Sequence, residues 1–180
     1  MNFRTLYVAT LGGITALLGA YQFLPGPSLG VATVPARVEL PGYVREDFGG
    51  WLPGTKDAVR ASQMRAGVLY DPYADAPAPA RVEVDHVFPL SAAWDMGAAT
   101  WPAQRKAEFA NDPLNLVATD RALNQAKSDK LPAQWLPPKR RCDYSKRLAA
   151  VAIKYQLPLP AADHAVMRKQ CRLDILLHPR

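Results

Sequence analysis

Residues 81–90, RVEVDHVFPL, have the pattern of a β-strand that ends at a proline. Valines at positions 82 and 84 alternate with polar side chains, as in a strand with one buried face. The strand ends in adjacent carboxylate and imidazole groups, Asp85 and His86. They are either polar groups bonded to the following loop or the centre of a site that holds a metal and moves a proton. Because neighbouring side chains alternate across a strand, one site can use both only if the strand twists or bulges there.

Helix signals surround this strand on both sides. The predicted helices combine good helix formers with an apolar stripe, or with Pro or Asp at the start. They are expected at residues 56–68, 102–111, 121–129, from Cys142 to about 156, and 160–177. Residues 69–80 are rich in turn residues and are expected to form a loop, and a short apolar run at 115–119 precedes the third of these helices. The order strand, long loop, short strand, helix predicts an α+β fold.

The N-terminal region has a different composition from the rest of the chain. No charged side chain occurs from Thr5 to Ala36, and the apolar stretch 6–24 is about as long as the roughly 20 residues that span a bilayer. We expect residues 1–24 to form a signal peptide or a membrane anchor, with a buried helix of the domain as the alternative. Residues 25–41 are expected to be an extended linker, and residues 42–180 the domain. The protein is therefore expected to be secreted or anchored in the cell envelope.

Charge and cysteine content fit an extracytoplasmic protein with a polyanionic partner. Residues 101–180 carry 15 Lys and Arg against 7 Asp and Glu, whereas residues 1–100 carry 7 against 9. A basic half of this kind favours nucleic acid or an anionic membrane surface as partner. The two cysteines, Cys142 and Cys171, would form a disulfide in an oxidising compartment, and two buried thiols are the alternative.

Three side chains suggest metal-assisted hydrolysis of a phosphodiester. Asp85 offers a carboxylate oxygen and Asn124 a carbonyl oxygen, both suitable ligands for Mg²⁺ or another hard divalent cation such as Mn²⁺. Neutral His86 can take a proton from water near pH 7. The metal would stabilise charge on the phosphate and the leaving oxygen while the imidazole activates the attacking water.

The motifs DHVFP, NDPLNL and LNQAKSD together resemble the signature of HNH endonucleases. GYVREDFGGW, DPYAD and NQAKSDKLPAQWLPP are similar to segments of the secreted DUF1524 group, which is related to the C-terminal domain of GmrSD. The resemblance covers roughly residues 42–171. It implies a ββα-metal core, also called a His-Me finger, surrounded by helices, and a metal-dependent endonuclease that cleaves DNA. Many members carry an additional cysteine pair, whereas this chain has DAVRAS, residues 57–62, with no cysteine.

The resemblance also implies a role for each matching residue. His86 corresponds to the general base, Asp85 and Asn124 to the metal ligands, and Asn115 to the central Asn that braces the loop between the strands. Lys127 lies one helical turn after Asn124, on the same face, where it would bind phosphate. A further catalytic residue is expected at position 60, where an arginine either forms an ion pair within the fold or contacts the scissile phosphate.

Basic residues at 139–147 lie immediately after the predicted catalytic segments. Lys139, Arg140 and Arg141 are expected to contact the DNA backbone, with a solvated surface as the alternative. No segment suggests a sequence-reading module, so low specificity is expected. Two other functions remain open: a catalytically silent envelope-associated protein that binds DNA, and a toxin nuclease that would need a cognate inhibitor protein.

Overall fold

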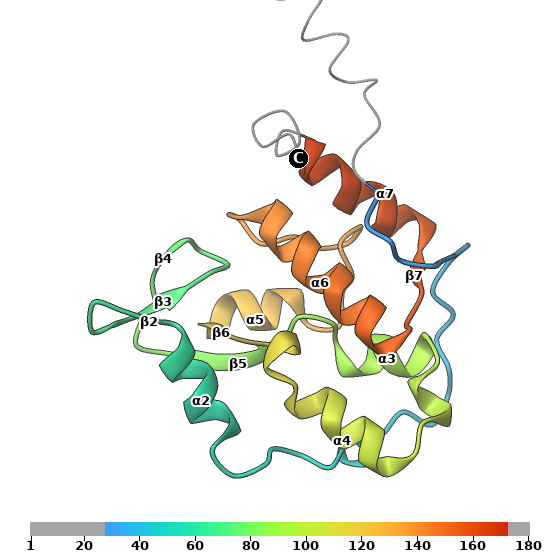
Figure 1. Ribbon diagram of the computed structural model, residues 1–180, viewed down its shortest axis with the longest axis horizontal. Helices are drawn as coiled ribbons and strands as arrows, with labels where there is room; N and C mark the ends of the chain where they lie inside the picture. Colours follow the sequence, from blue (N-terminus) through green and yellow to red (C-terminus); the bar gives the residue numbers. More distant parts are fainter. Residues whose placement is uncertain (1–27, 173–180) are drawn as a thin grey trace, which may run out of the picture.

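The computed structural model describes residues 28–172, and its centre is an antiparallel pair of strands (Figure 1). Strand β5 (Val82–His86) pairs with β6 (Leu116–Asp120) in five consecutive residue pairs, from Val82 opposite Asp120 to His86 opposite Leu116. Helix α5 (Arg121–Lys127) follows β6 directly and packs along β5. The described chain thus has the predicted α+β character and the predicted order of two strands and a helix.

Helices surround this central pair (Figure 1). The segment between β5 and β6 contains α3 (Leu90–Asp95), η2 (Ala98–Thr100), α4 (Ala103–Asn111) and η3 (Pro113–Asn115). Helices α6 (Arg141–Tyr155) and α7 (Ala161–Gln170) pack against each other, and η1 (Arg45–Phe48) lies on α3 and α4. None of the helices within residues 28–172 is long and apolar enough to cross a bilayer.

The two faces of the strand pair contact different cores. On one face, Val84, Leu116 and Ala118 pack against Val59 of α2 (Thr55–Ser62). On the other face, Val117 joins the main hydrophobic core, to which α3, α4, α6 and α7 contribute buried side chains. The strand pair is therefore covered on both sides, and each face of β5 has its own set of neighbours.

Two predictions of secondary structure need correction. The helix expected at 56–68 ends at Ser62, and the chain then forms a hairpin of β2 (Met64–Arg65) and β3 (Val68–Asp71) around Ala66 and Gly67. Both turn residues have positive φ, and glycine adopts that conformation without strain. The segment expected to be one loop from 69 to 80 contains β3 and β4 (Ala76–Pro77).

Residues 28–41 contain strand β1 (Thr33–Val34) and are bonded to the rest of the described chain. Strand β1 runs parallel to β7 (Leu159–Pro160). Arg37 pairs with Asp95 at 2.6 Å and with Asp129 at 2.9 Å. The folded body therefore begins before Gly42. The export segment or anchor predicted at residues 1–24 lies outside the described residues.

A disulfide joins Cys142 in α6 to Cys171 just after α7. The prediction of a bond between these two cysteines is therefore confirmed, and the alternative of two free thiols is wrong. The bond ties the last described helix to the one before it, and both of these helices contribute side chains to the main core.

Candidate active site

Asp85 is held in place from the main-core face of β5. Its carboxylate accepts hydrogen bonds from the hydroxyl of Tyr73 at 2.7 Å and from the ammonium of Lys127 at 2.9 Å. The same ammonium donates to the carbonyl of His86 at 2.7 Å. Burial raises the pKa of Asp85, while Lys127 and Tyr73 act in the opposite direction. The carboxylate is thus fixed in orientation and paired with a buried cation.

Tyr73 reaches Asp85 because of a tight turn in the DPYAD segment. The carboxylate of Asp71 accepts bonds from the backbone N–H of Tyr73 within that turn and from the hydroxyl of Thr119 on β6. The turn is therefore anchored to the central strand pair, and it holds Tyr73 beside Asp85. Burial is the main reason why the pKa of Tyr73 lies well above its usual value, so the hydroxyl remains a donor.

His86 points to the opposite face of β5 and is held by different residues. Its Nε2 lies 2.8 Å from the carbonyl oxygen of Ala110 in α4, and Trp51 stacks on its ring at 5.0 Å between centroids. Burial lowers the pKa of His86 to about 3, and the positive charges of Arg45 and Lys127 act in the same direction. Since a carbonyl can only accept, Nε2 carries the proton and Nδ1 is left as an acceptor.

Asp85 and His86 share one site without a bulge in the strand. Residue pairing is continuous through the end of β5, so the bulge suggested as one way to bring them together is not present. Both residues instead line a cleft of about 380 Å³ at the end of the strand. Asn124 of α5 lines the same cleft. The structure therefore brings together the three residues predicted to hold a cation and to activate water.

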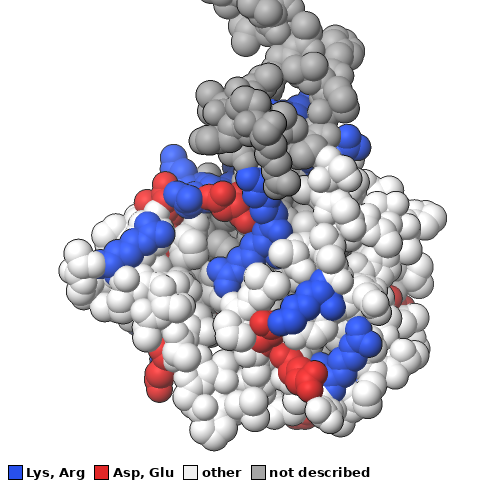
Figure 2. All heavy atoms as spheres, in the orientation of Figure 1, with Lys and Arg blue, Asp and Glu red and all other residues white. Residues whose placement is uncertain are grey.

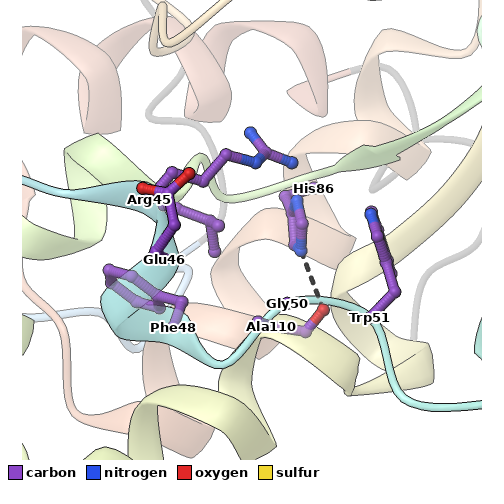
Figure 3. A pocket seen from close by; sticks show the side chains of 8 residues that line it. Arg45, Glu46, Phe48, Gly50, Trp51, His86 and Ala110 are labelled. Carbon is purple, nitrogen blue, oxygen red and sulfur yellow. Dashed lines mark hydrogen bonds between the residues drawn. The ribbon is translucent and has the colours of Figure 1, made fainter.

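A smaller, mainly apolar pocket of about 110 Å³ adjoins this cleft, and His86 lines both (Figure 3). Arg45 also borders both, and Figure 3 shows its guanidinium reaching toward the imidazole. Arg45 is exposed, and among the described residues it has no hydrogen-bond or ion-pair partner. A free guanidinium at this position can bind a phosphate oxygen.

Asn115 braces the loop that follows β5. It is fully buried, and its side chain accepts from the backbone N–H of Phe88 at 2.7 Å and donates to the carbonyl of the same residue at 3.2 Å. The backbone carbonyl of Asn115 also accepts from Val87 at 2.8 Å. These bonds fix the chain immediately after His86, so Asn115 shapes the site without facing the cleft.

The structure places Lys127 and Arg60 differently from expectation. Lys127 is fully buried, and its amine is bonded to Asp85, so it points into the protein and not toward a phosphate on the surface. Arg60 pairs with Asp57 at 3.3 Å on α2, and the described residues that line the cleft do not include it. Arg45, Trp51 and Tyr73 lie in segments that carry the family resemblance, but no sequence signal predicted a role for them.

The basic segment after α5 is exposed, but its charges are partly compensated. Lys139, Arg140 and Arg141 are all exposed at the surface. Arg140 pairs with Asp143 at 2.6 Å and with Asp75 at 3.3 Å. Figure 2 shows basic and acidic side chains interspersed on the face of the molecule in view.

The residues that line the cleft include several with side-chain oxygen atoms, among them Asp85 and Asn124. Within residues 28–172, no group of three or more His, Cys, Asp or Glu side chains could hold a metal ion. Asp85 and Asn124 supply one carboxylate and one amide oxygen, which matches the preference of Mg²⁺ for a few hard protein ligands alongside water and phosphate. The donor set therefore fits a cation that takes its remaining ligands from substrate and solvent.

Comparison with known proteins identifies the family. Residues 55–158 match the family described as GmrSD restriction endonucleases, C-terminal domain, and the chain belongs to this nuclease-like family. A protein of the fungus Arthroderma benhamiae, described as an uncharacterized secreted protein, is 34% identical over 148 residues, which are 70% of this chain and 72% of the relative. No solved structure gave a match.

Proposed function

We propose that this protein is a metal-dependent endonuclease of the HNH type that hydrolyses DNA phosphodiester bonds with low sequence specificity. The observation that carries the proposal is the shared cleft of His86, Asp85 and Asn124 at the end of β5. Membership of the GmrSD C-terminal domain family supports nuclease chemistry at this site. The same residues support a ββα-metal core formed by β5, β6 and α5.

His86 would act as the general base through Nδ1. Its lowered pKa keeps the imidazole neutral at physiological pH, and the bond from Nε2–H to Ala110 fixes the tautomer that leaves Nδ1 free. A water molecule in the cleft would transfer its proton to Nδ1 as it attacks phosphorus. Stacking on Trp51 keeps the ring from rotating during the transfer.

Asp85 and Asn124 would hold one divalent cation, Mg²⁺ or Mn²⁺. The cation would supply charge stabilisation at the phosphate and the leaving oxygen. Lys127 and Tyr73 fix the direction of the Asp85 carboxylate, and Arg45 would take the role of phosphate ligand first expected of Arg60. Each of these residues binds or orients a group, and none of them needs to change its protonation state.

Charge supports DNA as the substrate, and a relative supports secretion. A basic sequence with net charge +6, the exposed residues Lys139 and Arg141, and a cleft open to solvent suit a DNA backbone. The secreted relative supports secretion of this protein, with the apolar segment at residues 1–24 as the export signal or anchor. Exclusion, scavenging and toxin roles are all compatible with such a nuclease.

A DNA-binding protein without catalytic activity is the second candidate. The observation that favours it is the contact of 2.9 Å between Lys127 and Asp85, because a buried ammonium partly neutralises the carboxylate that would attract the cation. This candidate predicts DNA binding that is independent of divalent metal and of His86.

Plasmid cleavage by the purified protein separates the two candidates. With Mg²⁺ or Mn²⁺ we expect cleavage that EDTA abolishes and that His86→Ala reduces by about 10²–10⁴-fold while DNA binding survives. Arg45→Ala should also lower cleavage, whereas Arg60→Ala, which removes an arginine already paired with Asp57, should leave it near the wild-type rate. Binding without cleavage under every metal tested would establish the second candidate instead.

A further inference from the structure

Glu83 and Asn124 form a strand-to-helix contact beside the Asp85–Lys127 pair. Glu83 and Asp85 are two residues apart on β5 and therefore share a face. Asn124 and Lys127 are three residues apart on α5 and share a face in the same way. The amide nitrogen of Asn124 lies 2.8 Å from Oε2 of Glu83, next to the bond of 2.9 Å between Lys127 and Asp85.

The contact with Glu83 decides which way the Asn124 amide faces. A carboxylate can only accept hydrogen bonds, so the group turned toward Glu83 must be the NH₂ of Asn124. The amide is planar, and its carbonyl oxygen therefore points away from Glu83. Asn124 lines the cleft together with Asp85, so an oxygen turned away from Glu83 can face the cleft. The other carboxylate oxygen of Glu83 faces the guanidinium of Arg121 at 3.3 Å, which holds Glu83 from its far side.

We propose that Glu83 is a positioning residue that fixes the Asn124 amide with its oxygen toward the bound cation. This inference rests on the proposed function, because it assigns a second layer to the same metal site. Without Glu83 the amide of Asn124 loses the hydrogen-bond partner that sets its orientation. Groups that orient a metal ligand in this way typically change metal affinity by about 10–100-fold when removed.

A double-mutant cycle tests the orientation directly, with Mn²⁺ affinity of the full-length protein measured by electron paramagnetic resonance. Glu83→Ala should weaken Mn²⁺ binding by about 10–100-fold. Asn124→Asp replaces the amide with a carboxylate whose two oxygens are equivalent, so its function does not depend on rotation. In the Asn124→Asp background, Glu83→Ala should therefore leave Mn²⁺ affinity unchanged or increase it.

Glu83→Gln separates orientation from charge. The glutamine carbonyl can still accept from the NH₂ of Asn124, so affinity should fall by only a few-fold if orientation is the role of Glu83. If the negative charge itself attracts the cation, Glu83→Gln will lose as much as Glu83→Ala, and the proposal is wrong. Equal losses from Glu83→Ala in both backgrounds of the cycle would also overturn it.

Asp85→Ala distinguishes failure of this inference from failure of the proposed function. If Asp85→Ala and Asn124→Ala leave Mn²⁺ affinity unchanged, the metal site itself is misassigned. If these two variants lose affinity and Glu83→Ala does not, the site stands and only the role of Glu83 is refuted. Circular dichroism of each variant confirms folding, and Glu83→Gln keeps the test available should Glu83→Ala fail to fold.

Discussion

Replacing Lys127 with methionine removes the cation on which buried Asp85 depends. The lysine is fully buried, its amine lies 2.9 Å from the carboxylate, and Asp85 itself is 5% exposed. Breaking a buried ion pair by removing one partner costs about 3–5 kcal/mol, because the other charge is left without compensation. For a chain of this size, that loss corresponds to a melting temperature lower by about 6–20 °C.

The loss should shrink as the pH falls. In Lys127→Met, only the hydrogen bonds from Tyr73 and from the backbone of His86 oppose the effect of burial on Asp85, so its pKa rises further above the usual value. Neutralising the carboxyl by protonation costs about 1.4 kcal/mol for each pH unit above an unfolded pKa of about 3.9. The destabilisation of Lys127→Met is therefore about 4 kcal/mol at pH 7, within the range given above, and falls to about 1.5 kcal/mol at pH 5. The native variant then holds a proton that the unfolded chain lacks, so its deficit relative to wild type decreases toward acid pH.

Urea unfolding at pH 7 and pH 5, in EDTA, measures this difference as a change in the free energy of unfolding. Lys130→Met is the matched control, because Lys130 is an exposed lysine three residues later whose amine bonds only the carbonyl of Ala126 among the contacts described. It should change stability by less than about 0.5 kcal/mol. A Lys127→Met protein as stable as this control, or one whose deficit is the same at both pH values, would refute the electrostatic account of Asp85.

Three further predictions concern the other supports of the site. Without metal, the free energy of unfolding should fall as the pH drops from about 6.5 toward 3. The unfolded chain protonates His86 in this range, whereas the native state, in which its pKa is about 3, does not. His86→Phe should flatten this pH dependence in urea titrations across the range. Asn115→Ala should cost about 1–3 kcal/mol for each backbone group of Phe88 that loses its partner, seen as a lower urea midpoint. Replacing Cys142 and Cys171 with serine should cost about 3–4 kcal/mol, and dithiothreitol should reproduce the loss in the wild-type protein.

The sequence predicted the parts of the fold that depend on local pattern. The period-two alternation before Asp85 gave β5, and Asp120 caps α5 by accepting from Ala122, as its position before a helical pattern suggested. The same local rules failed between positions 62 and 68. There Met64 and Val68 fit a helical stripe, but the turn at Ala66 and Gly67 closes a hairpin instead. Competition between a weak helical period and a turn is decided by tertiary packing, which a single sequence does not contain.

The sequence indicated the polar residues of the cleft but not the residues from the η1 region that surround His86. Asp85, His86 and Asn124 have chemistry that suggests a role by itself, and the structure brings them to one cleft. Arg45 and Trp51 come from a segment about 40 residues earlier, and nothing local shows that they return to His86. The position of Glu83 follows from the sequence pattern, because alternation along a strand places it on the same face as Asp85.

Two neighbouring residues on a strand can hold two different functions because they point to opposite faces. Asp85 is fixed from the main-core side by Tyr73 and Lys127, whereas His86 is fixed from the other side by Trp51 and by a carbonyl of α4. Neither set of supports contacts the other side chain, apart from the bond of Lys127 to the backbone of His86. In the proposed mechanism, damage to one set should therefore impair cation binding or proton transfer separately. The continuous pairing of β5 fixes the separation of the two residues, so in that mechanism the strand sets the distance between base and cation.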